Sequence, residues 1–289
     1  MMPFYGQKDQ FIEAVQSVLA QTDVNWRLTV IDDKYPDTSP GEWFKSLSDS
    51  RLTYIRNDTN LLPSRNYNKS VGLATAEFVV IMGCDDVLLP NFVEYLRGLI
   101  SGSQDDVVLI QPGVAVIDEN GQHCTPMADR IKRRIMPAVE QQTRLHGEPL
   151  ATSLLRGNWT YFPSLAWRTS ELQKRTFRED LNVVQDLAMI MDLVLAGGVM
   201  VVDSEVCFLY RRHRHSFSGT TGPDGSKFRQ ERQLFSELAQ RTADRGWPQA
   251  STEARRHVLS RLNAATELPF ALASGNWAGM RNLSKHIFG

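Results

Sequence analysis

The first 110 residues alternate between two apolar periodicities, and this alternation restricts the fold more than any other feature of the chain. Apolar side chains from Phe11 to Leu19 recur every three or four residues, which predicts an amphipathic helix. A second helix is predicted over residues 64–74. Short, continuous apolar runs predict buried strands over residues 28–31, 52–55, 78–82 and 107–110. Strands that alternate with helices indicate an α/β fold with a mostly parallel central sheet flanked by helices.

The remainder of the chain is less regular. Residues 187–196 form a strongly apolar segment that follows Asp186 and ends at Gly197-Gly198, which predicts a helix. Two strands are predicted over 199–202 and 206–210, and from Pro223 onward the pattern is helical. We therefore expect one α/β domain over residues 1–218 and a helical C-terminal segment over 219–289. Four aromatic residues between these regions could either line an acceptor site or pack in the core: Trp159, Tyr161, Phe162 and Trp167.

The overall charge is small but unevenly distributed. A net charge of −1 over 289 residues argues against a general nucleic-acid-binding protein. Residues 1–120 carry 9 Lys/Arg and 17 Asp/Glu, a net of −8, and residues 121–289 carry 23 and 16, a net of +7. An acidic half can hold a divalent cation, and a basic half can meet anionic ligands or a peripheral membrane surface. The alternative is an uneven but solvated surface.

Cysteine usage points to a reducing compartment. The three cysteines are widely spaced, and no charged start with an apolar core resembles a signal peptide. We therefore expect a cytoplasmic protein, with the inner face of the membrane as a further expected location.

Two carboxylate pairs lie at the ends of predicted strands. Asp32-Asp33 follows the run 28–31, and Asp85-Asp86 follows the run 78–82. In open α/β sheets ligands bind beyond the carboxyl ends of the strands. Adjacent carboxylates repel each other unless a cation or hydrogen-bond donors compensate, and Mg²⁺ or Mn²⁺ bridging a diphosphate does so. The alternative is that each pair caps a turn or helix, as aspartate often does. Two such pairs at successive strand ends favour the cation.

Several other sites are excluded by their missing motifs. The sequence contains no GxGxxG, no GxxxxGK[ST] and no GxSxG, and its Cys and His spacings do not make a zinc site. Dinucleotide-binding, P-loop and serine-hydrolase functions therefore lose their main support.

Taken in order, several segments resemble the family 2 glycosyltransferases, which have the GT-A fold. The N-terminal segments are Pro3-Phe4-Tyr5, the helix from Phe11 to Gln21, and Val30-Ile31-Asp32-Asp33. The later segments are Asn60 to Asn66, Phe78 to Asp86, Gln185-Asp186, and the run from Tyr210 through His213 to Ser216. Each motif is weak alone, but their order and spacing over residues 1–218 are specific. The resemblance implies an inverting enzyme that transfers a sugar from a nucleotide-diphosphate sugar to an acceptor hydroxyl.

The resemblance also implies a role for each matching residue. Pro3 and Tyr5 would line the nucleotide pocket, Asp33 would bind the base, and Arg65 would approach the nucleotide or its diphosphate. Asp85 would hold the ribose, and Asp86 would bind Mn²⁺ or Mg²⁺ with the help of His213. Asp186 would be the catalytic base, and we expect the dipole of its helix to keep it ionised. The donor is expected to be UDP-linked, and the acceptor a saccharide or a lipid-linked molecule.

Each role has a structural alternative, and the chain departs from the family in three places. Asp186 could only cap its helix, Arg65 could lie on the surface, and His213 could belong to a solvated basic loop. Gly83 stands where many relatives carry another Asp, and Gln185 replaces the acid that usually precedes the base. The family's first strand normally includes an apolar run before Pro3, so we expect a shortened first strand. A non-catalytic protein that binds nucleotide sugars or carbohydrates is the main alternative function. A nucleotidyltransferase is a weaker one, because the expected Gly- and Lys-rich phosphate loop is missing.

Overall fold

The N-terminal part of the sheet is parallel. In the computed structural model, which describes residues 1–139, 141–213 and 226–288, the first sheet has the order β1-β2-β3. Its strands are β1 (Met2–Phe4), β2 (Leu28–Asp32) and β3 (Leu52–Arg56). They are connected by helices α1 (Lys8–Leu19) and α2 (Ser39–Ser46), which return the chain to the same end of the sheet and so allow parallel pairing. The predicted helix and both predicted strands of this region are confirmed.

The second sheet is mixed. Its order is β4-β8-β6-β9-β5, with β7 paired to β9. The strands are β4 (Phe78–Val80), β5 (Val87–Leu88), β6 (Val107–Ile117), β7 (Thr143–Leu145), β8 (Ala166–Arg168) and β9 (Val199–Arg211). β6 and β9 run parallel, whereas β8 is antiparallel to β4 and β6. Met1 joins the two sheets, because its nitrogen donates to Val80 O (2.9 Å) and its carbonyl accepts from Met82 N (3.0 Å). The α/β architecture is confirmed, with antiparallel strands added at its centre.

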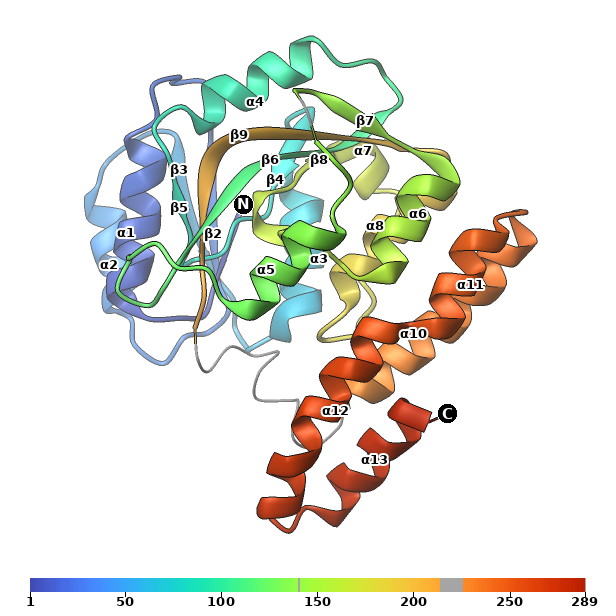
Figure 1. Ribbon diagram of the computed structural model, residues 1–289. Coiled ribbons are helices and arrows are strands. Elements are labelled where there is room, and N and C mark those ends of the chain that lie inside the picture. Colours follow the sequence, from blue (N-terminus) through green and yellow to red (C-terminus); the bar gives the residue numbers. More distant parts are fainter. Residues whose placement is uncertain (140, 214–225, 289) are drawn as a thin grey trace.

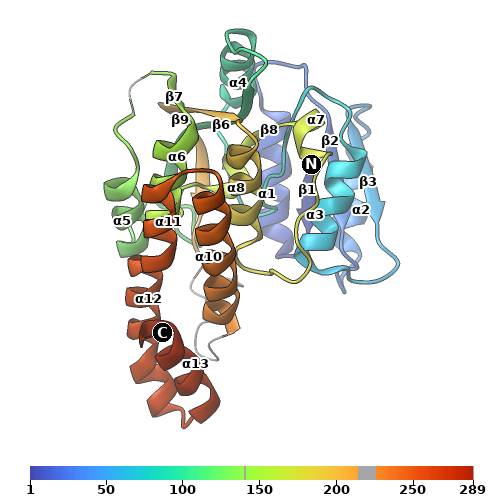
Figure 2. The ribbon, with the colours of Figure 1, turned by 90° about the vertical axis from the view of Figure 1, so that its right-hand side faces the viewer.

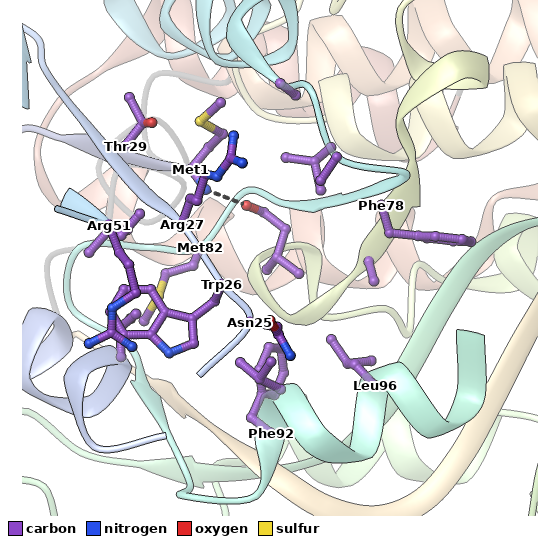
Figure 3. Close-up of a pocket in the computed structure, with 18 of the residues that line it drawn as sticks. Met1, Asn25, Trp26, Arg27, Thr29, Arg51, Phe78, Met82, Phe92 and Leu96 are labelled. Carbon is purple, nitrogen blue, oxygen red and sulfur yellow. Dashed lines mark hydrogen bonds between the residues drawn. The ribbon is translucent and has the colours of Figure 1, made fainter. Parts of the chain in front are cut away.

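Strand β1 is shorter than its neighbour, as expected from the sequence. β2 pairs with β3 from Leu28 onward but with β1 only from Val30. A hollow of about 860 Å³ lies beside the start of β1 and is lined by Met1, Leu28 and Phe78 among other residues (Figure 3). This hollow is at the amino ends of the parallel strands, on the opposite side from the edge where such sheets bind ligands.

Helices cover the sheet and form two hydrophobic core clusters (Figure 1). The remaining helices of this part are α3 (Leu62–Leu73), α4 (Phe92–Ser101), α5 (Met127–Ile135), α6 (Gly147–Arg156), the 3₁₀ turn η1 (Phe162–Ser164), α7 (Thr169–Leu172) and α8 (Gln185–Leu195). In one cluster the rings of Phe4 and Phe11 lie 4.4 Å apart, which fixes α1 against β1. The other includes α6, α8 and the fully buried Trp159 and Trp167. These two tryptophans are therefore core residues rather than part of an acceptor site.

Four helices make up the described C-terminal segment: α10 (Ser226–Asp244), α11 (Pro248–Arg256), α12 (Val258–Ala273) and α13 (Trp277–Phe288). Helices α10 and α11 share the core cluster of α6 and α8, and Arg241 pairs with Asp192 of α8 at 2.7 Å. Helices α12 and α13 pack around a separate small cluster and extend away from the sheet (Figures 1 and 2). The predicted helical segment is confirmed from Ser226, while the expected boundary at 218/219 lies outside the described residues. Within the described ranges, no helix is both long and apolar enough to cross a membrane.

The two strands predicted over 199–202 and 206–210 are one strand, β9. The polar residues from Asp203 to Glu205 suggested a break, but they form an exposed irregularity in β9, and the pairing register with β6 shifts beside it. Gly113 of β6 makes this close passage possible, since a Cβ there would lie 2.5 Å from the carbonyl oxygen of Ser204.

Candidate active site

The predicted site residues follow the carboxyl ends of neighbouring strands. Tyr5 follows β1, Asp33 follows β2, Asp85 and Asp86 follow β4, and His213 follows β9. Pro3 lies within β1, opposite Ile31. Tyr5 is 54% exposed, and its ring meets the ring of Tyr35 edge-on at 5.4 Å. The topology therefore gathers segments that are distant in sequence at one edge of the sheet.

The first carboxylate pair is compensated by donors of the protein itself. Asp32 is fully buried and accepts hydrogen bonds from Tyr35 N (2.8 Å), Tyr54 OH (2.6 Å) and Arg56. Asp33 is 4% exposed, and its Oδ1 accepts from Asn57 Nδ2 (2.8 Å) and Leu61 N (2.7 Å). Asp32 thus stabilises its turn, which is the structural alternative considered for this pair. A base-binding role for Asp33 stays a prediction.

The second pair leaves one carboxylate oxygen without a partner. Asp86 is 1% exposed; its Oδ1 accepts from Arg211 N (2.9 Å), but its buried Oδ2 has no hydrogen-bond partner among the described residues. Burial, and then the neighbouring Asp85, raise the pKa of Asp86 well above its usual range. A Cβ on Gly83 would lie 2.5 Å from Asp86 Oδ2 and 2.7 Å from Asp85 Oδ1. The two carboxylates therefore face the same small space beside Gly83, and a side chain at that position would collide with them.

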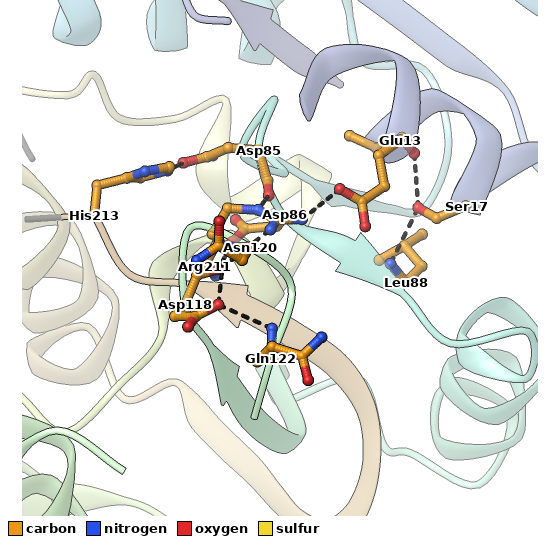
Figure 4. A network of polar contacts seen from close by, with 11 residues as sticks. Glu13, Ser17, Asp85, Asp86, Leu88, Asp118, Asn120, Gln122, Arg211 and His213 are labelled. Atoms are coloured by element: carbon orange, nitrogen blue, oxygen red, sulfur yellow. Dashed lines mark hydrogen bonds and ion pairs between the residues drawn. The ribbon is translucent and has the colours of Figure 1, made fainter. Parts of the chain in front are cut away.

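His213 and Arg211 hold this pair in place (Figure 4). His213 Nε2 lies 2.7 Å from Asp85 Oδ2. The Arg211 side chain is 1% exposed; it donates to Asp85 O (2.7 Å), to Asp118 O (3.2 Å) and to Glu13 Oε2 (2.6 Å). One buried guanidinium thus links β9 to the carboxylate loop, to the turn after β6 and to α1. The sequence analysis missed Arg211, although it stands two residues before His213 in the basic run that was noted.

The second pair meets the chemical requirements of a Mg²⁺ or Mn²⁺ site better than the first. Within the described residues, no group of three or more His, Cys, Asp or Glu is arranged as a complete metal site. Mg²⁺, however, commonly binds through one or two carboxylates and takes its other ligands from phosphate and water. An unpartnered, buried carboxylate oxygen is the kind of group that such a cation would satisfy.

Asp186 lies in the first turn of α8, where Asn158 Nδ2 donates to its Oδ2 at 2.9 Å. Burial raises the pKa of Asp186, and the backbone N–H of Leu187, the charge of Lys132 and the Asn158 bond oppose that rise. The expectation that the helix N-terminus alone keeps this carboxylate ionised is therefore incomplete, because desolvation is the largest effect. A carboxylate with a raised pKa is a better proton acceptor near neutral pH.

Lys132 is the cation beside Asp186. Its Nζ donates to Thr160 O at 2.6 Å, and burial lowers its pKa to about 8. Helix α5 carries Lys132 and is fixed by Asp129, which is fully buried and accepts from Arg212 Nε (2.9 Å) and Tyr161 OH (3.0 Å). The sequence analysis missed Lys132, because nothing distinguishes it within the basic stretch from Arg130 to Arg134.

Tyr67 connects the two acidic regions. Burial is the largest cause of the raised pKa of this phenol, and the negative charges of Asp186 and Asp85 raise it further. Asp186 and the second carboxylate pair therefore surround one buried side chain of α3. Arg65 is directed elsewhere, since it is 61% exposed and pairs with Glu179 at 2.7 Å. Its predicted approach to the nucleotide is not supported by a contact with the carboxylates.

Comparisons with known proteins agree with this architecture. The family described as Glycosyl transferase family 2 matches residues 1–156. The succinoglycan biosynthesis protein ExoO of Rhizobium meliloti is 22% identical over 218 residues, which cover 74% of this chain and 60% of that protein. The UDP-Glc:alpha-D-GlcNAc-diphosphoundecaprenol beta-1,3-glucosyltransferase WfgD of Escherichia coli is 32% identical over 96 residues, covering 32% of this chain and 37% of WfgD. The chain thus spans 60% of the length of the first of these relatives and a smaller part of the second.

Solved structures show the same fold at low sequence identity. The S. aureus TarS 1-349 structure in complex with UDP-GlcNAc superimposes with a TM-score of 0.65 at 16% identity, covering 99% of this chain and 89% of that one. Another structure of TarS 1-349 gives a TM-score of 0.65 at 17% identity, over 90% and 70% of the two chains. Because the family match covers more than half of the 289 residues, the chain belongs to glycosyl transferase family 2.

Proposed function

We propose that this chain transfers a sugar from a nucleoside-diphosphate sugar to an acceptor hydroxyl, with inversion at the anomeric carbon and assistance from a divalent metal. The observation that carries the proposal is the arrangement of Asp186 and the Asp85-Asp86 pair around Tyr67. One carboxylate is positioned to accept a proton, and the other two can hold a cation that meets a diphosphate. A transfer reaction needs both functions in one site.

Asp186 is the proposed general base. It would accept the proton of the acceptor hydroxyl as the oxygen attacks the anomeric carbon, a contribution of about 10²–10⁴-fold. Asn158 orients the carboxylate through its 2.9 Å hydrogen bond, and the charge of Lys132 lowers the pKa of Asp186 against the effect of burial. The base is therefore ionised more readily than burial alone would allow.

Asp86 and Asp85 are the proposed metal ligands, with His213 adjoining Asp85. The Oδ2 atom of Asp86, which is buried and has no partner among the described residues, is the feature that fits Mn²⁺ or Mg²⁺. When bound there, the metal would neutralise the diphosphate of the donor and of the departing nucleotide. Arg211 keeps Asp86 in place through its backbone N–H and keeps Asp85 in place through its guanidinium.

The proposed donor is UDP-linked, and the proposed acceptor is a saccharide or a lipid-linked molecule. TarS has been solved with UDP-GlcNAc and with UDP, and WfgD is named for a UDP-glucose donor and a diphosphoundecaprenol-linked acceptor. Pro3 and Tyr5 would line the uridine pocket beside Asp33, at the ends of β1 and β2. These assignments support a choice of substrates to test first.

A nucleotide-release assay tests the proposal directly. The chain would be incubated with UDP-glucose, UDP-GlcNAc, GDP-mannose and a dTDP-sugar, each with and without Mn²⁺ and with a panel of glycan and lipid-diphosphate acceptors. We expect release of UDP that depends on both acceptor and metal, and a product with inverted anomeric configuration by proton NMR. Binding of a UDP-sugar without turnover on any acceptor would favour the alternative, a nucleotide-sugar-binding protein of the same fold. Gly83 and the shortened β1 are the features that keep this alternative in view.

A further inference from the structure

The turn between α12 and α13 forms an uncharged apolar tip, which we define as residues 268–280. No Asp, Glu, Lys or Arg occurs between Glu267 and Arg281. Phe270, Leu272 and Trp277 are 66%, 60% and 74% exposed. The tip lies at the end of the helical hairpin that extends away from the sheet (Figures 1 and 2). Large apolar side chains gathered at the end of a projecting element indicate a contact surface rather than a random surface position.

The tip is a folded structure whose backbone polar groups are paired. Ser274 N donates to Phe270 O (3.0 Å), Asn276 N donates to Ala271 O (3.0 Å), and Gly279 N donates to Asn276 Oδ1 (2.9 Å). Gly275 adopts φ +66°, which closes the end of α12 without strain. Because unpaired backbone groups are the main obstacle to entering an apolar medium, this tip can enter one at low cost.

Cations follow the tip along α13. Arg281 and Lys285 come four and eight residues after Trp277, so they lie on the same side of the helix, and both are exposed. Glu267 is the only acidic residue between 254 and 288. Other arginines of the segment are already engaged, since Arg241 pairs with Asp192 and Arg261 donates to Ile287 O at 3.0 Å. The basic character available to a partner is therefore concentrated next to the tip.

We propose that the tip docks into the interfacial region of an anionic lipid bilayer. Phe270, Leu272 and Trp277 would enter the boundary between headgroups and acyl chains, where aromatic side chains are favoured, and Arg281 and Lys285 would meet lipid phosphates. A second copy of the chain is a poorer occupant, because a stable dimer needs roughly 800 Å² per partner and thirteen residues at a helical turn offer much less. The proposal does not depend on the identity of the reaction.

Vesicle binding by the full chain tests the proposal without donor or acceptor. We would measure co-sedimentation with vesicles of phosphatidylcholine alone and of three parts phosphatidylcholine to one part phosphatidylglycerol. We expect stronger binding to the second, weakening as NaCl rises from about 0.05 to about 0.5 M, because salt screens the cations. The triple variant Phe270→Ser, Leu272→Ser, Trp277→Ser should lose at least about tenfold in partitioning, which is about 1.4 kcal/mol. Arg281→Gln with Lys285→Gln should remove most of the preference for phosphatidylglycerol.

Matched controls separate the tip from the rest of the hairpin. Val258 and Leu262 are 50% and 57% exposed on α12 but lie outside the tip, so Val258→Ser with Leu262→Ser should bind vesicles like the wild type. All these side chains are exposed, so thermal unfolding should change little. The proposal is overturned if the wild type does not bind the anionic vesicles at low salt, or if the triple variant binds them equally well. It is also overturned if sedimentation velocity shows a dimer that the triple variant dissolves while vesicle binding is absent.

Discussion

Replacing Arg211 by methionine should both destabilise the protein and weaken its use of metal. The side chain is 1% exposed and donates to two main-chain carbonyls, Asp85 O at 2.7 Å and Asp118 O at 3.2 Å. Hydrogen bonds from a charged donor contribute about 1.5–3 kcal/mol each, so these two predict a loss of about 3–6 kcal/mol in the free energy of unfolding. The third partner, Glu13, is 49% exposed, so that ion pair adds less than about 1 kcal/mol.

The metal readout distinguishes a positioning role from a purely structural one. The Arg211 charge and backbone N–H lower the pKa of Asp86 against the effect of burial, so removing the charge should leave fewer Asp86 carboxylates ionised. We expect the Mn²⁺ concentration for half-maximal UDP binding to rise in Arg211→Met and to be partly restored in Arg211→Lys. Glu13→Gln is the control and should change neither quantity by much. The reasoning is refuted if urea unfolding of Arg211→Met matches the wild type within about 1 kcal/mol, or if stability falls but Mn²⁺ dependence is unchanged.

Three further predictions concern single residues of the site. Asp86→Asn should abolish the additional thermal stabilisation that Mn²⁺ gives to the UDP-bound protein while leaving the melting temperature of the free protein near normal; an unchanged Mn²⁺ effect would rule out Asp86 as a ligand. Asp33→Asn should weaken UDP binding, measured by calorimetry, by about 1–3 kcal/mol, the range for a hydrogen bond to a charged group, and equal affinities would contradict its base-binding role. The rate should rise with pH as Asp186 loses its proton and fall near pH 8 as Lys132 loses its own; Lys132→Met should remove the alkaline fall and move the acid limb to higher pH, because the lysine charge lowers the pKa of Asp186. An identical pH profile in that variant would exclude the coupling.

The sequence predicted those parts of the fold in which one face of a segment is buried along its length. Apolar periodicity located α1, β2, β3, α3 and α8 because each buries a continuous stripe or run. It missed β8, whose three residues are too few to show a period, and it divided β9 at the polar residues near Ser204. That strand continues only because Gly113, distant in sequence, allows the close passage, and such a pairwise effect leaves no local signal.

The site was predictable where side chains follow strand ends and unpredictable where they depend on packing. Asp85 and His213 were singled out from their positions in the chain, and the structure brings them within 2.7 Å. Lys132 and Arg211 were missed, because their importance comes from burial beside carboxylates that lie far away in sequence. The pKa of Asp186 differs from the expectation for the same reason, since desolvation depends on the packing around it.

The central claim is that Asp186 acts as the base of a sugar transfer, and Asp186→Asn tests it most directly. The substitution keeps the size of the side chain and removes its ability to accept a proton, while metal and donor binding rest on other residues. Transfer would be measured as acceptor-dependent UDP release, and donor affinity by calorimetry on the same preparations. We predict an unchanged fold, donor affinity within about twofold of the wild type, and a loss of transfer of at least about 10²-fold, the low end for general-base catalysis. Near-normal transfer in Asp186→Asn, or an equal loss of donor affinity and transfer, would contradict the account.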